Sequence, residues 1–163
     1  MLIRPARPDD RPAIWDILEP TLRAGETYAL PRDMNEADAL AYWLGPDRTT
    51  FVAEEDGRIL GTYYMRANQP GGGDHVCNCG YMTHPAEVGR GVARQMGEHS
   101  LEEARRRGFR AMQFNFVVSS NERAVRLWQG LGFEVVGRLP HAFRHPSEGY
   151  VDALVMFQPL APA

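Results

Sequence analysis

The chain contains no lysine, because all 18 of its basic residues are arginines. This absence excludes mechanisms that depend on a lysine side chain, such as Schiff-base formation and phosphate binding by a P-loop. Positive charge is not in excess either, since the formal net charge is -3 and the isoelectric point is about 5.9. A protein with this balance has no electrostatic reason to bind nucleic acid. We therefore expect no nucleic-acid partner.

Long apolar runs and cysteines are also scarce. The first residues, MLIRPARPDD, contain charges and prolines and offer no stretch for a signal peptide or a membrane-spanning helix. Cys77 and Cys79 are too close in sequence for an unstrained disulfide. Together with His75 they cannot form a metal site, because alternate strand residues advance about 6.6 Å. We expect a cytoplasmic protein with no metal and no membrane partner.

The hydrophobic pattern predicts one α/β domain over residues 1–163, with elements in the order β-α-α-β-β-β-α-β-α-β-β. Apolar residues at helical spacing alternate with short runs rich in β-branched and aromatic residues. Strands are expected over 2–6, 50–54, 59–66, 75–83, 110–118, 133–136 and 150–157, and helices over about 10–24, 33–44, 90–107 and 121–131.

The segment YMTHPAEVGRGVA leads from a strand into a helix through a turn of small residues. Gly89, Gly91 and Ala93 let the backbone approach a ligand closely and leave the first amides of the helix unpaired. Those amides and the helix dipole favour a phosphate or pyrophosphate. A glycine-rich turn at the start of an ordinary helix is the alternative. The mid-chain position of the turn argues against a dinucleotide-binding fold.

This turn, taken with a second segment, resembles the GNAT superfamily of N-acetyltransferases. Pro85, Gly91 and Ala93 match the family's first motif, while Thr83 and Val88 depart from its usual Val and Arg/Gln. Further along, NERAVRLWQGLGF resembles the family's N-x-x-A-x-x-L-Y-x-x-x-G-F segment. The two motifs occur in the family's order, and the resemblance covers nearly the whole chain.

The resemblance implies a mixed, mostly antiparallel sheet of six to seven strands, flanked by four helices and splayed at its central parallel strands. It implies acetyl-CoA as cofactor, with the pyrophosphate at the glycine turn and the pantetheine arm beside the preceding strand, like an added strand. The cofactor-binding residues that it implies are Tyr81, Thr83, Val88, Gly89, Arg90, Gly91, Val92, Ala93, Asn121 and Trp128.

Acetyl transfer from a thioester to an amine needs a neutral amine, a stabilised carbonyl oxygen and a leaving thiolate. The resemblance assigns the carbonyl contact to the backbone amide of Tyr81. Trp128 stands where the family often has a tyrosine acid, and an indole does not deliver a proton at neutral pH. Expulsion of a thiolate needs no strong acid. Cys77 stands where many members have a glutamate base, and His75 is either a base or a loop-edge histidine.

Asn115 is a single polar residue within the apolar run FNFVV. A buried amide needs partners, so Asn115 either faces a polar cavity, as a catalytic and substrate-binding residue, or has a structural role. The surrounding QFNFVVSSN resembles the fungal acetyltransferases of proline analogues, which act on small cyclic amino acids. Further substrate contacts are expected from Glu26 and Tyr28 between the first helices and from Phe143 in the last hairpin. Arg144, in the same hairpin, has the chemistry to bind a carboxylate.

The sequence therefore predicts an acetyl-CoA-dependent N-acetyltransferase. The acceptor is expected to be a small-molecule amine, such as an amino acid or an analogue, attacking directly in a ternary complex. A protein or peptide N-acetyltransferase is one alternative. A non-catalytic acyl-CoA-binding sensor is another, because the family's tyrosine and glutamate are both missing. A homodimer is expected from the resemblance alone.

Overall fold

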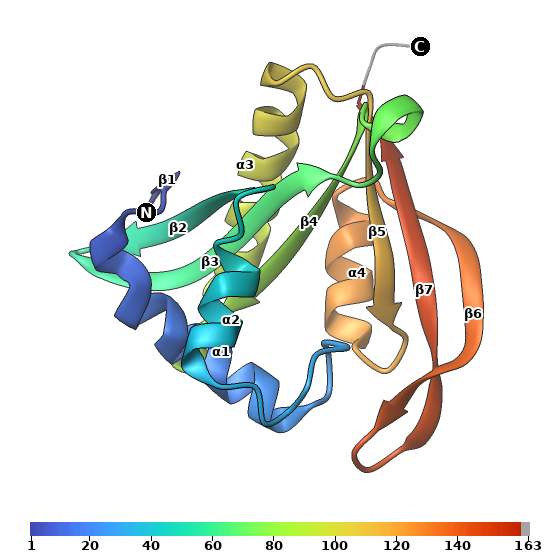
Figure 1. The fold of residues 1–163 in the computed structure, drawn as a ribbon. Coiled ribbons are helices and arrows are strands. Elements are labelled where there is room, and N and C mark those ends of the chain that lie inside the picture. The colour runs from blue at the N-terminus through green and yellow to red at the C-terminus, as the bar shows by residue number, and fades with distance from the viewer. Residues whose placement is uncertain (161–163) are drawn as a thin grey trace.

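The computed structural model describes residues 1–160, which form one seven-stranded sheet in the order β1-β2-β3-β4-β5-β7-β6 (Figure 1). Only β4 and β5 are parallel neighbours, and all other neighbouring strands are antiparallel. The strands are β1 (Leu2–Pro5), β2 (Thr49–Glu55), β3 (Arg58–Ala67), β4 (Val76–Thr83), β5 (Ala111–Val118), β6 (Glu134–His145) and β7 (Gly149–Pro159).

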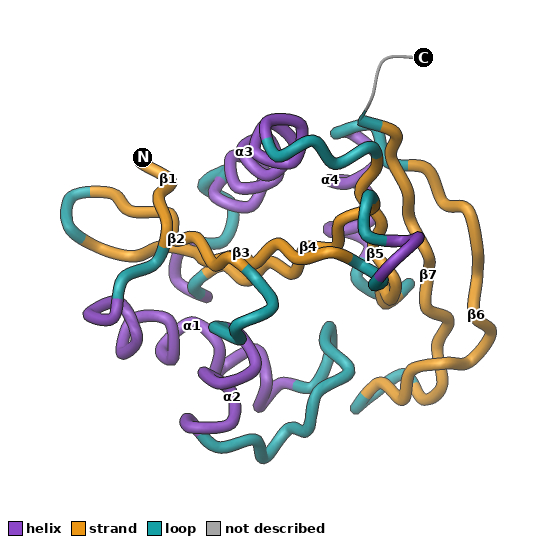
Figure 2. Tube along the Cα trace, turned by 45° about the horizontal axis from the view of Figure 1, so that its top comes forward, coloured by secondary structure: helices purple, strands orange, loops and turns teal. Residues whose placement is uncertain are grey.

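Helices cover both faces of the sheet. Helices α1 (Arg11–Ala24) and α2 (Glu36–Trp43) lie on one face, and α3 (Val92–Arg106) and α4 (Glu122–Gly130) lie on the other (Figure 2). Each layer has its own apolar core. The α1/α2 core includes Ile14, Leu18, Trp43, Val52, Tyr64 and Met82, and the α3/α4 core includes Met65, Met96, Met112, Phe114 and Trp128. The expected fold class and element order are confirmed.

Strands β4 and β5 pair only at their first residues, Val76 with Ala111 and Cys77 with Met112. Beyond these pairs the two strands separate, as Figure 1 shows, and β5 continues along β7 instead. The β5–β7 register shifts between Phe114 and the residues that follow it. The expected splay at the parallel strands is therefore present, and it opens the sheet at its centre.

Two boundaries differ from the sequence prediction by three residues or more, and the others agree with it to within two. Helix α2 begins at Glu36 rather than near residue 33, because the Asn35 side chain accepts a hydrogen bond of 2.8 Å from the amide of Asp38. Strand β6 extends to His145, so Phe143 and Arg144 lie in a strand rather than in a hairpin loop. The full length of β6 could not be predicted, because its pairing with β7 shifts register twice and interrupts the alternation of apolar residues.

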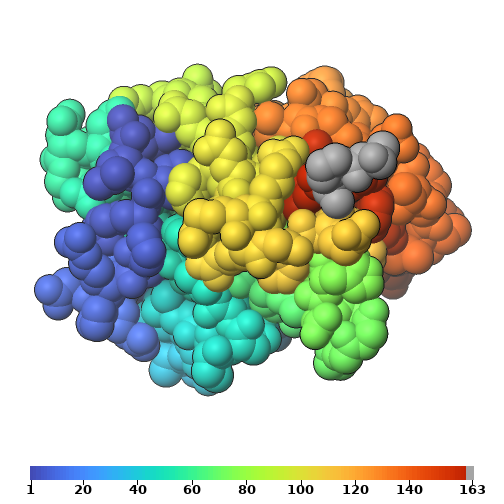
Figure 3. Space-filling view, turned by 90° about the horizontal axis from the view of Figure 1, so that it is seen from above, coloured from blue at the N-terminus to red at the C-terminus, as the bar shows by residue number. Residues whose placement is uncertain are grey.

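Short 3₁₀ helices complete the chain, at Pro8–Asp10, Gly71–Gly73 and Pro85–Glu87. Seen from above, the end of α3 and the turn after it lie between the N-terminal elements and the C-terminal strands (Figure 3). Cys77 and Cys79 are buried free thiols, and burial raises the pKa of the Cys79 thiol. No helix within residues 1–160 is long and apolar enough to cross a membrane.

Candidate active site

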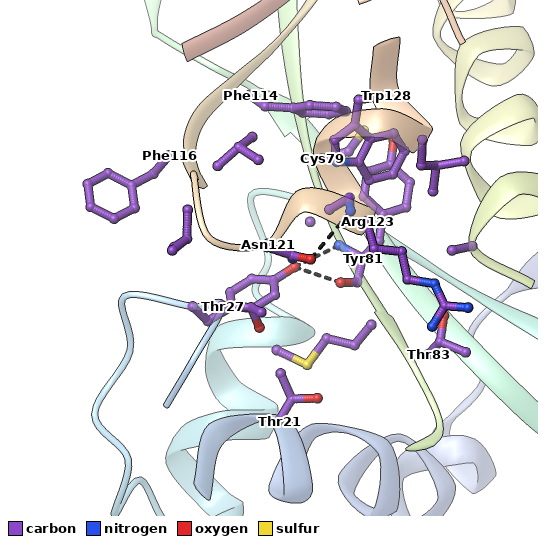
Figure 4. A pocket seen from close by; sticks show the side chains of 18 of the residues that line it. Thr21, Thr27, Cys79, Tyr81, Thr83, Phe114, Phe116, Asn121, Arg123 and Trp128 are labelled. Carbon is purple, nitrogen blue, oxygen red and sulfur yellow. Dashed lines mark hydrogen bonds between the residues drawn. The ribbon is translucent and has the colours of Figure 1, made fainter. Parts of the chain in front are cut away.

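The space between the splayed strands is a cavity of about 590 Å³. Its wall combines the loop between α1 and α2 with β3, β4, β5 and the first turns of α3 and α4. A cavity of this size is typical of a site for a small molecule or a cofactor. Figure 4 shows the side chains that line it.

One end of the cavity is the N-terminus of α3. Gly91 caps this helix with φ of 78°, and Gly89 has φ of 91°, a region that glycine enters at no steric cost. An ideal Cβ at Gly91 would meet nothing within 4 Å, so the turn is open. Within the described chain no side chain caps α3, and its first amides remain free to bind an anion. This end fits a pyrophosphate.

Arginine side chains add positive charge at the same end. Arg94 and Arg123 line the cavity, and an ideal Cβ at Gly89 would lie 3.5 Å from Arg123 Nη2. The Arg90 side chain is instead turned to Glu87 and Glu55 and is not part of the cavity wall. Arg94 and Arg123 escaped the sequence analysis, although each lies within three positions of a residue that the motifs marked.

Glu87 is the one carboxylate in the cavity wall among residues 1–160. Its side chain is 7% exposed and accepts hydrogen bonds from Arg58 (2.9 Å) and Arg90. The hydrogen bond from Arg90 lowers the pKa of this carboxyl group. Glu87 is therefore an ionised partner of two arginines, near the start of α3, and is not a free base.

Tyr81 lines the cavity, and its backbone polar groups are bound by Tyr28 from the α1–α2 loop. The Tyr81 amide donates to the Tyr28 hydroxyl oxygen, and the same hydroxyl donates to the Tyr81 carbonyl, both at 2.8 Å (Figure 4). Burial raises the pKa of Tyr28 well above its usual value, so the hydroxyl stays protonated at neutral pH. The Tyr81 side chain points elsewhere, with its hydroxyl 2.6 Å from Ser100 Oγ.

The two cofactor-binding residues expected from the second motif, Asn121 and Trp128, line the cavity from the α4 side. Asn121 caps α4 by accepting a hydrogen bond from the amide of Ala124 at 3.3 Å. Trp128 is 7% exposed, and its ring centroid lies 4.7 Å from that of Tyr81 and 4.9 Å from that of Phe114. The indole is therefore packed among aromatic rings in the cavity wall.

Asn115 lies in the cavity wall, where the β5–β7 register shifts. Its amide nitrogen donates to Asn68 Oδ1 at 2.6 Å, and its amide oxygen accepts from Gln113 Nε2 at 2.9 Å. The Asn115 side chain is thus held from both sides. Asn78, on β4, also lines the cavity and donates to the Gln113 carbonyl at 2.9 Å.

The expected substrate residues separate into two groups. Tyr28 and Asn115 line the cavity, whereas neither Glu26 nor Phe143 belongs to its wall in the described part of the chain. Glu26 is exposed, and Phe143 packs behind Phe116, with ring centroids 6.2 Å apart. His75 and Arg144 are also exposed and outside the wall.

A polar and aromatic wall that the sequence analysis missed faces the α1/α2 side. It consists of Tyr42 from α2 with Tyr64 and Arg66 from β3. An ideal Cβ at Gly80 would lie 2.6 Å from the Tyr64 ring, so the glycine allows this ring to cross β4. Alternation along β3 was the available signal, because residues 64 and 66 share one face of the sheet.

Comparison with known proteins places this arrangement in a family. The model of the acetyltransferase (GNAT) family matches residues 11–133. N-acetyltransferase aca1 of Schizosaccharomyces pombe is 35% identical over 111 residues, which are 68% of this chain and 53% of that protein. The chain therefore matches about half the length of this curated relative.

Solved structures agree with the sequence match. A GCN5-related N-acetyltransferase from Kribbella flavida is 44% identical, with a TM-score of 0.93 and coverage of 98% of this chain and 97% of that chain. YncA, a putative acetyltransferase from Salmonella typhimurium solved with its cofactor acetyl-CoA, is 25% identical, with a TM-score of 0.86 and coverage of 100% and 95%.

This chain belongs to the acetyltransferase (GNAT) family. The family consists of N-acetyltransferases that use acetyl-CoA, so the family, the enzyme class and the cofactor expected from the sequence are confirmed. Among residues 1–160, no three histidine, cysteine, aspartate or glutamate side chains are grouped so as to hold a metal ion.

Proposed function

We propose that the chain transfers the acetyl group of acetyl-CoA to the amine of a small molecule, by direct attack in a ternary complex. The observation that carries this proposal is the single cavity wall that joins the open N-terminus of α3 to Tyr81 and Asn115. It provides an anion site at one end and a polar chamber at the other, as a cofactor and an acceptor require.

Different residues of the chain bind the pyrophosphate and the pantetheine arm of the cofactor. The α3 amides after Gly91, with Arg94 and Arg123, bind the pyrophosphate. The edge of β4 near Thr83 pairs with the pantetheine arm, and Asn121 contacts the same arm. Bound acetyl-CoA supplies the acetyl group as a thioester. Trp128 packs against the Tyr81 ring and excludes water from that side of the cavity.

At the reacting end, the Tyr81 amide donates to the carbonyl oxygen as negative charge develops there. Asn115 orients the acceptor or a water that takes the proton of the amine, because it belongs to the cavity wall and its amide is held by two partners. The wall contains no free carboxylate within the described residues, so the acceptor enters as a neutral amine or gives its proton to water.

The size of the acceptor end favours a small molecule over a folded protein. The rings of Tyr28, Tyr42 and Tyr64 line it, and Tyr42 Oη lies 3.4 Å from Tyr64 Oη. A peptide would instead need an open groove with backbone partners. Acetylation of a peptide N-terminus is accordingly the second candidate, not the first.

The direct test is a panel of small amines and short peptides with acetyl-CoA, followed by detection of the released thiol. Turnover with small amines supports the proposal, and turnover confined to peptides favours the second candidate. Calorimetric binding of acetyl-CoA without turnover of any acceptor would favour a sensor.

A cytoplasmic location and a homodimer complete the proposal. The two buried thiols suit a reducing compartment. Apolar side chains exposed on β6 and β7 offer surface for a second copy, namely Val135, Val136, Leu139 and Tyr150. Sedimentation of the purified chain measures the oligomeric state, and fractionation of cells measures the location.

A further inference from the structure

The acceptor end of the cavity is an acceptor chamber lined by Tyr28, Tyr42 and Tyr64. Two guanidinium groups beside it have nitrogen atoms without a hydrogen-bond partner. Arg48 Nη1 and Arg66 Nε are buried and have no hydrogen-bond partner among residues 1–160. Both side chains approach the same carboxylate, since Asp47 Oδ1 lies 2.9 Å from Arg48 Nε and Asp47 Oδ2 lies 3.8 Å from Arg66 Nη1. Two positive charges therefore share one negative charge, and one positive charge is left without a partner.

Aromatic rings hold Arg48, which is also the arginine that binds Asp47 through two hydrogen bonds. The Arg48 side chain is 8% exposed, and its guanidinium carbon lies 4.8 Å from the ring centroid of Tyr42 and 4.5 Å from that of Tyr64. Both rings also line the cavity. A stacked guanidinium is fixed in orientation, so Arg48 stays bound to Asp47, and Arg66, whose side chain is 30% exposed, is the guanidinium left for another anion.

Arg66 brings that charge into the chamber itself. It lines the cavity from β3, opposite Asn78 on β4 in the pairing of the two strands. Asn78 precedes Tyr81 by three residues, or about 10 Å along the strand. A small amino acid together with an extended arginine side chain is long enough to span this distance, with its amine at the thioester carbonyl bound by the Tyr81 amide and its carboxylate at Arg66.

A buried donor without a partner costs free energy, and a cation costs more than a neutral group. An anion that enters the chamber removes this cost. A planar carboxylate matches both the single excess charge and the fork of the guanidinium group. Arg144, the arginine that the sequence suggested for this task, lies outside the cavity wall.

We propose that Arg66, beside the Arg48–Asp47 ion pair, is the subsite for a carboxylate on the acceptor, so the acceptor class is small amino acids. This inference rests on the proposed function, because it names the acceptor of the same cavity. The test measures kcat/KM with acetyl-CoA for glycine, L-alanine, L-proline and L-methionine and for their carboxamides. The wild-type protein is expected to prefer the carboxylates.

Arg66→Gln should lower kcat/KM for the carboxylates by about 10- to 100-fold, mainly through KM, and leave the carboxamides nearly unchanged. Arg66→Lys should restore part of the loss. Asp47→Asn provides an independent variant that leaves Arg66 intact, and it should lower KM for the carboxylates because their competitor is removed. Arg106→Gln, at the far end of α3, is the matched control.

Several results would overturn the carboxylate subsite. These are equal use of carboxylates and carboxamides by the wild type, an equal loss on both in Arg66→Gln, or acetylation confined to amines without a carboxylate. Acetyl-CoA binding with no turnover of any amino acid in the panel also overturns it, while leaving the cofactor site intact. Failure of the proposed function looks different, because the protein would then either fail to bind acetyl-CoA in calorimetry or acetylate no small amine, with or without a carboxylate.

Discussion

The Tyr28 hydroxyl binds both backbone polar groups of Tyr81, accepting from the amide and donating to the carbonyl at 2.8 Å each. The amide expected to bind the thioester carbonyl is therefore already paired within the protein. An acetyl group competes with Tyr28 for this donor, whereas CoA without an acetyl group does not. The loop that carries Tyr28 thus affects how strongly the site distinguishes the loaded cofactor from the spent one.

Tyr28→Phe should bind acetyl-CoA more tightly relative to CoA. Loss of the hydroxyl leaves the Tyr81 amide free for the thioester carbonyl, and one neutral hydrogen bond corresponds to about 2- to 10-fold in affinity. Calorimetric titration with both ligands gives the ratio. Tyr42→Phe is the control, because its hydroxyl lies 3.4 Å from Tyr64 Oη and does not contact Tyr81. An unchanged ratio, or a ratio shifted toward CoA, would show that Tyr28 does not compete.

Gly91→Glu should abolish acetyl-CoA binding while the chain remains folded. The added carboxylate enters the anion site at the start of α3 and repels the pyrophosphate. Strain at positive φ costs about 1 kcal/mol and accompanies any side chain at this position. Calorimetry measures binding, and circular dichroism checks the fold.

The control for this prediction is Gly57→Glu. Gly57 has φ of 76° in the turn between β2 and β3, and an ideal Cβ there also meets nothing within 4 Å. The substitution therefore carries the same strain and the same charge away from the cavity wall. Acetyl-CoA affinity should stay at the wild-type value in Gly57→Glu. Unchanged affinity in Gly91→Glu would remove the pyrophosphate from the α3 terminus.

Trp128→Phe should retain a substantial fraction of kcat and lose thermal stability. The indole packs against Tyr81 and Phe114 at 7% exposure, so a smaller ring leaves a void, but no proton donor is lost. Steady-state kinetics and a melting curve on one preparation measure both effects. A loss of kcat of about 100-fold in a folded variant would equal the loss of a general acid, and it would assign the indole a direct role.

The free energy of unfolding should decrease as pH decreases below 6.5, because protonation of His99 is less favourable in the folded state. Burial lowers the pKa of His99 from 6.5, partly offset by Glu103 and Glu102, and the Tyr63 hydroxyl lies 2.8 Å from His99 Nδ1. The folded state therefore binds this proton less readily than the unfolded state does. The contribution is present above pH 6.5 and is lost as pH falls below it.

Melting temperatures between pH 7.5 and 5 test this effect. His99→Gln should flatten the pH dependence below pH 6.5, and His75→Gln, an exposed histidine before β4, should leave it unchanged. Identical profiles for wild type and His99→Gln would show that other groups control the acid sensitivity.

The sequence predicted the fold well where local signals and the family motif agreed. Pro85, Gly89 and Gly91 mark the start of α3, and Asn121 marks the start of α4, because turn glycines and cap residues act locally. The family resemblance correctly predicted the splay of β4 and β5. Strand β6 was shortened because its register shifts leave no regular alternation to read.

The acceptor end of the site was harder to predict. Arg66 and Tyr64 reach the cavity only through the pairing of β3 with β4, and Tyr42 reaches it through the packing of α2. Such contacts join residues that are far apart in the sequence, so no local sequence pattern predicts them. Glu26 neighbours Tyr28 in the chain but faces solvent, since one loop presents successive side chains in different directions.

Asn115 remains the main candidate for positioning the acceptor. Asn115→Ala should lower kcat/KM for the acceptor by about 10- to 1000-fold, the range for one positioned polar contact. Acetyl-CoA affinity should barely change, because the α3 terminus and Asn121 hold the cofactor in the proposed site. Steady-state kinetics and calorimetry on the same preparation measure the two effects.

Asn68→Ala separates a catalytic role of Asn115 from a structural one. Asn68 is outside the cavity wall but accepts the 2.6 Å hydrogen bond from the Asn115 amide. Asn68→Ala therefore removes a partner of Asn115 and keeps the Asn115 side chain itself. If Asn115 acts on the acceptor, Asn68→Ala lowers kcat/KM less than Asn115→Ala does. If Asn115 is structural, both variants lower the melting temperature and the folded fraction keeps wild-type kinetics. That second pattern would remove Asn115 from the site, because a group that positions the acceptor cannot be deleted without a kinetic effect.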